Sequence, residues 1–140
     1  MKKAFALVLL TIILLTTFSV AWADSVQPRY SHVALISAGL DINGGVANCR
    51  GVGCSEFNYT YNYLYVRLLR CPQNGGNWGP VTSWMVQTTG FDMATISENI
   101  TVEKGYDYKV YVNLQIKDET GYILDSVGIY SDVKSYHTTP

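Results

Sequence analysis

The three cysteines, Cys49, Cys54 and Cys71, have the most distinctive side-chain chemistry in this chain. An odd number leaves at least one thiol unpaired within a monomer. The bonds Cys49–Cys54, Cys49–Cys71 and Cys54–Cys71 stay open as candidate disulfides, and so does the absence of any bond. On one unbroken strand Cys49 and Cys54 face opposite ways, so a bond between them requires a turn at residues 51–53. If the second and third strands pair antiparallel, Cys71 comes nearer to Cys49 than to Cys54.

Metal binding and nucleophilic catalysis are not expected from these thiols. The spacing Cys-x4-Cys with one distant cysteine lacks the paired ligands of a zinc site, and His32 and His137 lie far from it in the sequence. A catalytic cysteine needs a histidine base beside it, and no sequence feature places one there. We therefore expect no metal site and no cofactor.

Glycoside hydrolysis would need a pair of carboxylates drawn from the scattered acidic residues. Asp41, Glu56 and Asp92 stand in turn-like or solvent-facing contexts that explain them without chemistry. Glu98 instead interrupts the apolar face of a predicted strand, which predicts a β-bulge there. Glycine-rich phosphate loops and nucleophile elbows are absent from the sequence. The sequence predicts a protein that is not an enzyme, with a small cell-wall hydrolase kept as an alternative.

A tyrosine-rich surface is the remaining candidate site. In the predicted third strand, residues 58–71, Leu64, Val66 and Leu68 alternate with tyrosines, so the aliphatic face is expected to pack on the core. If the third, sixth and seventh strands share a sheet, their outward side chains form one surface. Its candidate ligand-binding residues are Tyr61, Tyr63, Tyr65, Arg67, Tyr111, Asn113 and Tyr130, with Lys109 and Gln115 beside them. Aromatic rings flanked by amides and charges suit a sugar or a protein partner. Alternatively, the tyrosines only stabilise the sheet through cross-strand pairs.

The stretch of residues 105–117 positions this surface. Its alternation between apolar and polar residues is the longest in the chain, which predicts the central strand of the fold. The predicted inward residues are Tyr106, Tyr108, Val110, Val112, Leu114 and Ile116, and the outward ones are Asp107, Lys109, Tyr111, Asn113, Gln115 and Lys117.

Other short alternating segments, separated by turn signals, predict the remaining strands. The first has His32, Ala34, Ile36, Ala38, Leu40 and Ile42 on one face. The second, residues 46–52, is expected to bend or end early at Gly51-Val52-Gly53. The fourth contains residues 81–86 with Trp84 as a core or rim residue, the fifth residues 94–102, and the last residues 127–133.

About seven short strands and no helical period predict an all-β fold, a seven-stranded antiparallel β-sandwich. Tyr108 follows Glu103-Lys104-Gly105 and precedes Val110 and Val112. This pattern resembles the tyrosine corner of immunoglobulin-like and fibronectin type III-like domains, in which the hydroxyl bonds back to the turn before the sixth strand. The core disulfide of immunoglobulin domains is not expected, because the sixth strand has no cysteine.

The first 23 residues have the features of a signal peptide: Lys2 and Lys3, an apolar run, and the small-x-small motif Ala21-Trp22-Ala23. We expect residues 24–134 to form the sandwich domain, without a membrane span, and residues 135–140 to be a flexible tail. Loss of the two lysines makes the mature chain mildly acidic, and it contains no basic run, so nucleic acid is not an expected partner. The expected location is extracellular.

The mature chain also resembles a group of small secreted proteins of Gram-positive gut bacteria, classed only as a domain of unknown function. The matching residues are Arg29-Tyr30-Ser31, Leu40-Asp41-Ile42, Gly45-Val46-Ala47-Asn48-Cys49-Arg50-Gly51, Leu68-Leu69-Arg70, Trp78, Val81, Trp84, Gly90 and Gly105-Tyr106-Asp107-Tyr108. The resemblance implies a secreted β-sandwich and supplies no catalytic or binding residues. We therefore expect a secreted, non-catalytic binding or adhesion module for a cell-surface glycan or protein, with a bacteriocin-like antagonist as an alternative.

Overall fold

The structure is a computed structural model that describes residues 31–137. Within these residues the chain forms eight β-strands. They are β1 (Val33–Asn43), β2 (Val46–Ser55), β3 (Tyr61–Pro72), β4 (Gly79–Thr89), β5 (Ala94–Thr101), β6 (Tyr106–Lys117), β7 (Ile123–Tyr130) and β8 (Lys134–Tyr136). The predicted signal peptide and residues 24–30 of the predicted domain lie outside the described residues, as do residues 138–140. No helix among the described residues is long and apolar enough to cross a membrane.

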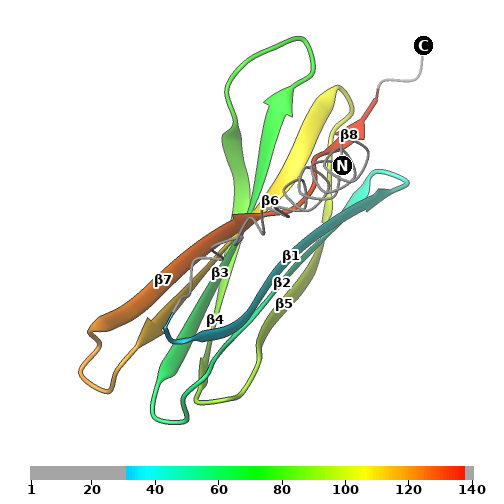
Figure 1. The fold of residues 1–140 in the computed structure, drawn as a ribbon. Helices are drawn as coiled ribbons and strands as arrows, with labels where there is room; N and C mark the ends of the chain where they lie inside the picture. The colour runs from blue at the N-terminus through cyan, green and yellow to red at the C-terminus, as the bar shows by residue number, and fades with distance from the viewer. Residues whose placement is uncertain (1–30, 138–140) are drawn as a thin grey trace, which may run out of the picture.

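Two antiparallel sheets form the sandwich. One has three strands in the order β1-β2-β5; the other has five, in the order β4-β3-β6-β7, with β8 also paired to β6. The sheets face each other as two layers of an elongated molecule, and the loops of residues 56–60, 90–93 and 118–122 lie at one end of it (Figure 1). An all-β sandwich was predicted, but with seven strands: Ser135 and Tyr136, expected in a tail, lie in β8.

Strand β6 is the central strand, as its alternation predicts. It pairs with β3 along its whole length on one side and with β7 and β8 on the other. From Tyr108 to Ile116 every second side chain is buried, and the residues between them are only partly covered. Leu64, Val66 and Leu68 of β3 are likewise fully buried, which confirms the aliphatic face as the core face. Trp84 of β4 is half-buried against the same core.

The early end expected for the second strand at Gly51-Val52-Gly53 is wrong, because β2 continues through these residues to Ser55. A Cβ atom built on Gly51 would lie 2.3 Å from Val66 Cγ2, and one on Gly53 would lie 2.9 Å from Leu114 Cδ2. The side chains of the opposite sheet therefore occupy the space above these two glycines. Glycine is needed here for close packing between the sheets.

The predicted bulge at Glu98 is also wrong. The pairing of β2 with β5 is continuous from Val46–Thr101 to Gly53–Ala94, with Cys49 opposite Glu98. Strand β5 is an edge strand and Glu98 is exposed there, so the side chain reaches solvent without a register shift. An irregularity occurs instead between Val33 and Leu35 of β1.

The shift in β1 changes the inward face expected for the first strand. Val33 packs against the core, whereas Ala34 is exposed. His32, expected on the core face, is half-buried, and its ring lies 5.3 Å from that of Phe57.

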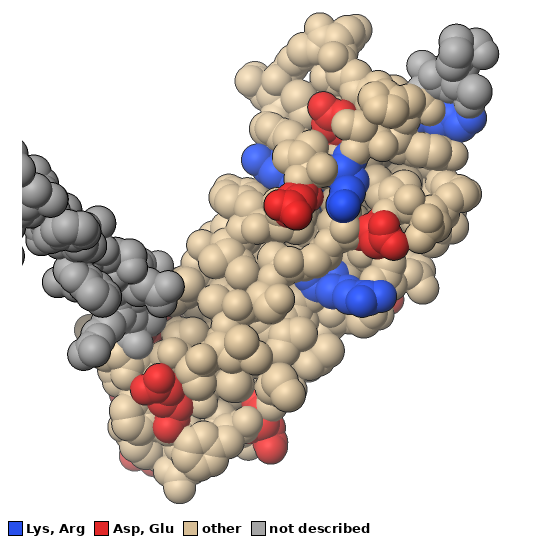
Figure 2. Space-filling view, turned by 45° about the vertical axis from the view of Figure 1, so that its right-hand side comes forward, with Lys and Arg blue, Asp and Glu red and all other residues tan. Residues whose placement is uncertain are grey.

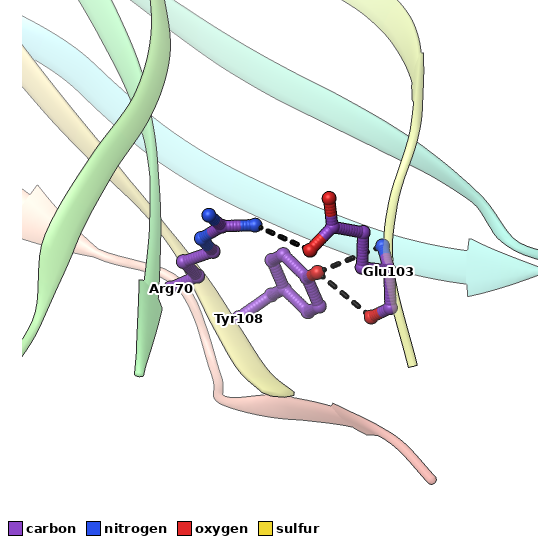
Figure 3. Close-up of polar contacts among 3 residues, drawn as sticks. All are labelled: Arg70, Glu103 and Tyr108. Carbon is purple, nitrogen blue, oxygen red and sulfur yellow. Dashed lines mark hydrogen bonds and ion pairs between the residues drawn. The ribbon is translucent and has the colours of Figure 1, made fainter. Parts of the chain in front are cut away.

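Tyr108 connects the start of β6 to the preceding loop, as the sequence predicts. Its hydroxyl donates a hydrogen bond to the Glu103 carbonyl (2.8 Å) and accepts one from the Glu103 N–H (3.0 Å), while Arg70 Nη1 lies 2.9 Å from Glu103 Oε2 (Figure 3). Burial raises the pKa of Tyr108, so the phenol stays protonated and can donate. Both backbone groups of Glu103 are thereby satisfied by one side chain.

Candidate functional site

The outer surface of the β4-β3-β6-β7 sheet brings the predicted tyrosine residues together in cross-strand rows. One row consists of Ser83, Arg67, Tyr111 and Tyr130; the next of Met85, Tyr65, Asn113 and Gly128; and the third of Gln87, Tyr63, Gln115 and Ser126. The rows follow directly from antiparallel pairing, which places opposite residues on the same face. The backbone pairing within the sheet fixes the order and the spacing of these rows.

A shallow groove of about 550 Å³ lies in this surface. It is lined by Tyr65, Val66, Arg67, Ser83, Trp84, Met85, Tyr111, Asn113, Gln115 and Ser126. Ser83 lies opposite Arg67 and Ser126 opposite Gln115, so small side chains stand beside large ones in this surface. We call these ten residues the sheet groove.

Tyr111 lies across β7 at the edge of the sheet groove. A Cβ atom on Gly128 would lie 2.3 Å from the Tyr111 hydroxyl oxygen and 2.8 Å from its ring, so the absence of a side chain at Gly128 lets the phenol lie over the strand. The rings of Tyr111 and Tyr130 have centroids 4.9 Å apart at 41°. This packing holds the Tyr111 ring in place, as a binding surface requires.

Two lysines on β6 pack their ammonium groups against aromatic rings of the same face. Lys109 Nζ lies 4.2 Å from the ring centroid of Trp78 and 4.5 Å from that of Tyr130. Lys117 Nζ lies 4.2 Å from the centroid of Tyr63. These cation–π contacts keep the positive charges on the outer surface of the sheet.

Four of the seven predicted binding residues line the sheet groove: Tyr65, Arg67, Tyr111 and Asn113. The other three, Tyr61, Tyr63 and Tyr130, lie on the same strands but outside its lining. Tyr63 is instead covered by Lys117, and Tyr130 supports Tyr111.

Sequence reasoning missed Ser83, Met85 and Ser126 among the lining residues. Met85 follows Trp84 in an alternating strand, so strand parity already placed it outward. Ser126 has the same outward parity as Tyr130, but it precedes the residues 127–133 predicted for the last strand. Asn113 Nδ2 donates to Ser126 Oγ (3.3 Å) and to the Val127 carbonyl (3.2 Å), which orients its amide group beside the groove.

All three cysteines are free, so none of the three candidate disulfides forms and the remaining alternative, no bond, is the one observed. Cys49 faces the core from β2, whereas Cys54 faces outward on the same unbroken strand. Because β2 and β3 belong to different sheets, the end of β3 is not beside Cys49 in a hairpin. Cys71 pairs with Asp107 on the outer face of its sheet, so the sheet separates it from Cys49.

Thiol labelling checks this arrangement. Burial raises the pKa of Cys49 from 9.0 to about 11, so both its protonation and its inaccessibility oppose alkylation at pH 8. We expect two thiols, Cys54 and Cys71, to react in the native protein, and the third only after unfolding. A Cys49→Ala variant should still show two reactive thiols in the native state, and unfolding it should expose no third one. Thiols that appear only after reduction would contradict the unpaired state.

The carboxylates considered for catalysis, Asp41, Glu56, Asp92 and Glu98, do not line the sheet groove. No residue that lines the sheet groove carries a carboxyl group, and the part of the chain that the structure describes contains no group of three His, Cys, Asp or Glu residues suited to a metal. Asp41 is engaged locally, accepting hydrogen bonds from the Ile42 N–H and from Asn43 Nδ2. On the face shown in Figure 2, lysine and arginine side chains are interspersed with acidic and uncharged ones and form no continuous basic patch.

Comparison with known proteins assigns no family. No protein-family model matches the chain, and no curated protein sequence matches it. Among solved structures, the chain is similar to the sporulation control protein Spo0M from Bacillus subtilis, with a TM-score of 0.32 and 11% sequence identity. The match covers 69% of this chain and 48% of Spo0M. The β-sandwich itself is shown by the strand pairing, and the resemblance to the gut bacterial proteins stays a prediction.

Proposed function

We propose that this protein is a secreted, non-catalytic binding module that recognises a cell-surface glycan through the sheet groove. The observation that carries the proposal is the groove itself: Tyr65 and Tyr111 lie beside Asn113 and Gln115 on paired strands. Aromatic faces cover the apolar C–H groups of a sugar ring, and amides satisfy its hydroxyl groups. A rigid sheet holds these groups without a large ordering cost on binding.

The groove chemistry favours binding over hydrolysis. Acid–base cleavage of a glycosidic bond uses two carboxyl groups that flank the bond, and the lining residues supply an arginine, amides, hydroxyls and aromatic rings instead. Secretion is supported by the signal-peptide pattern of residues 1–23.

Two features support an immunoglobulin-like or fibronectin type III-like topology. Strands β3, β6 and β7 share one sheet and β1, β2 and β5 the other, as strands C, F and G and strands A, B and E do in those domains. The hydroxyl of Tyr108 makes the tyrosine-corner contact before the sixth strand. Strand β4 lies beside β3, whereas constant-type immunoglobulin domains place their fourth strand in the other sheet.

Co-sedimentation of the mature protein with purified cell walls and insoluble polysaccharides tests the proposal. We expect the wild-type protein to sediment and a Tyr65→Ser/Tyr111→Ser variant to lose at least tenfold in affinity, since each aromatic contact contributes about 0.5–1.5 kcal/mol beyond its buried area. Far-UV circular dichroism should be unchanged, because Tyr65 is exposed and Tyr111 lies on the outer face of the sheet.

A Tyr59→Ser/Tyr122→Ser variant is the matched control. Both tyrosines are exposed and lie in loops at the end of the sandwich, away from the sheet groove. Equal loss of binding in the two variants would reject the groove as the site. A wild-type protein that sediments with none of these polymers would reject a glycan ligand and leave a protein partner.

A further inference from the structure

The sheet groove carries an unneutralised positive charge. Arg67 is its only charged lining residue and its side chain is exposed. In residues 31–137, the ion pair found is Arg70–Glu103. Arg67 has no carboxylate partner there. It is therefore free to bind an acidic ligand without first breaking an ion pair.

Two further cations extend this charge along β6. Lys109 and Lys117 point to the same side of the strand as Tyr111, and their ammonium groups rest on aromatic rings rather than on carboxylates. The two lysines are eight positions apart, which corresponds to roughly 26 Å along an extended strand. The carboxylate on the same face of β6, that of Asp107, lies beyond Lys109 at the start of the strand. Its Oδ1 atom accepts hydrogen bonds from Ser135 Oγ (2.6 Å) and Gln73 Nε2 (3.3 Å). The groove thus lies within a cationic stripe on a chain whose net charge is −1.

We propose that the ligand of the sheet groove is an anionic polysaccharide, with carboxylate or phosphate groups that bind Arg67. This inference rests on the proposed function and narrows its ligand class. Arg67 pairs across the strands with Tyr111, and Tyr65 lies two residues away on the same face of β3. A guanidinium fork binds a carboxylate or phosphate in a bidentate manner, while the neighbouring rings cover the sugar. A polymer with repeated charges also reaches Lys109 or Lys117.

Matched polymers separate charge from sugar recognition. Polygalacturonate and its methyl ester share a backbone and differ in charge, and a phosphomannan and its dephosphorylated form do the same for phosphate. We expect at least tenfold tighter binding to polygalacturonate or to the phosphomannan than to its neutral counterpart, and the preferred acid identifies the group that the protein recognises. Binding should weaken as salt rises from 0.05 to 0.5 M, because exposed charges are screened. Equal affinity for the acidic polymers and their neutral counterparts would overturn the inference.

An Arg67→Gln variant tests the residue, with Arg50→Gln as its control. Arg50 is an exposed arginine on β2, in the other sheet, so its replacement causes the same change in net charge. We expect Arg67→Gln to lose about tenfold or more in affinity for the acidic polymers and to keep its affinity for neutral ones, while Arg50→Gln binds like wild type. Equal effects of the two variants would overturn the assignment to Arg67.

The outcomes distinguish this inference from the proposed function. If the Tyr65→Ser/Tyr111→Ser variant loses binding while Arg67→Gln does not, the groove binds a neutral glycan and only the anion assignment is wrong. If the wild-type protein binds none of the polymers, acidic or neutral, both are wrong.

Discussion

Replacing Gly51 with alanine is expected to lower the free energy of unfolding by about 1–3 kcal/mol, because overpacking a dense core forces shifts in both sheets. The added methyl group would lie 2.3 Å from Val66 Cγ2 and 3.1 Å from Val112 Cγ2. Both valines are fully buried in the central strands of the opposite sheet, so neither has free space into which to move. Urea denaturation measures the effect as a lower midpoint at an unchanged m-value.

Gly39→Ala is the matched control for this prediction. Gly39 lies on the neighbouring strand β1, and a Cβ atom there would be 3.6 Å from Arg50 Cβ, an ordinary contact. We expect its free energy of unfolding to stay within about 0.5 kcal/mol of wild type. If the two alanine variants were equally stable, close packing between the sheets would not be the reason for glycine at position 51.

Replacing Tyr108 with phenylalanine is expected to lower the free energy of unfolding by about 1–3 kcal/mol. The ring still fills its buried site, but the Glu103 carbonyl loses its donor and the Glu103 N–H loses its acceptor. The cost comes from leaving these two backbone groups unpaired next to the core. The exposed Arg70–Glu103 ion pair cannot compensate, because such pairs contribute little. Thermal and urea denaturation both report the change.

Tyr106→Phe separates the hydrogen bonds of Tyr108 from the general loss of a hydroxyl group. Tyr106 lies two residues before Tyr108 on β6. Its ring packs against the guanidinium group of Arg70, whose Cζ atom lies 4.5 Å from the ring centroid. A phenylalanine keeps that face, so we expect a change within about 0.5 kcal/mol. Equal destabilisation by both variants would show that the contact with Glu103 does not stabilise the fold.

The features that sequence reasoning predicted well depend on local alternation. Period-two patterns in β3 and β6 identified their core faces, because successive side chains in a strand point to opposite sides whatever the neighbouring strand. The contact of the Tyr108 hydroxyl with the preceding loop was also predicted, since Tyr108 and Glu103 are close in sequence and joined by a short loop. The outward parity of Tyr65, Arg67, Tyr111 and Asn113 followed from the same rule.

The failures concern residues whose role depends on a distant segment. Gly51 and Gly53 suggested an early end of the second strand, but β2 continues through them. Glycine is needed at these positions because Val66 and Leu114 of the other sheet occupy the space that a side chain would take. Glu98 suggested a β-bulge, but it lies on the edge strand β5, where its side chain reaches solvent without one. The cysteines looked pairable, but Cys71 lies on the outer face of its sheet.

By itself, the sequence determined an all-β chain, the inward and outward faces of its central strands and a row of outward tyrosines. These follow from strand periodicity, a local property of the backbone. Only the tertiary structure decided which rows lie side by side and that a groove forms between Tyr65 and Tyr111. It also decided that Arg67 stands in this groove with no carboxylate partner among residues 31–137. Those features depend on register and on packing between strands far apart in sequence, and they arise only when the sheets form and pack.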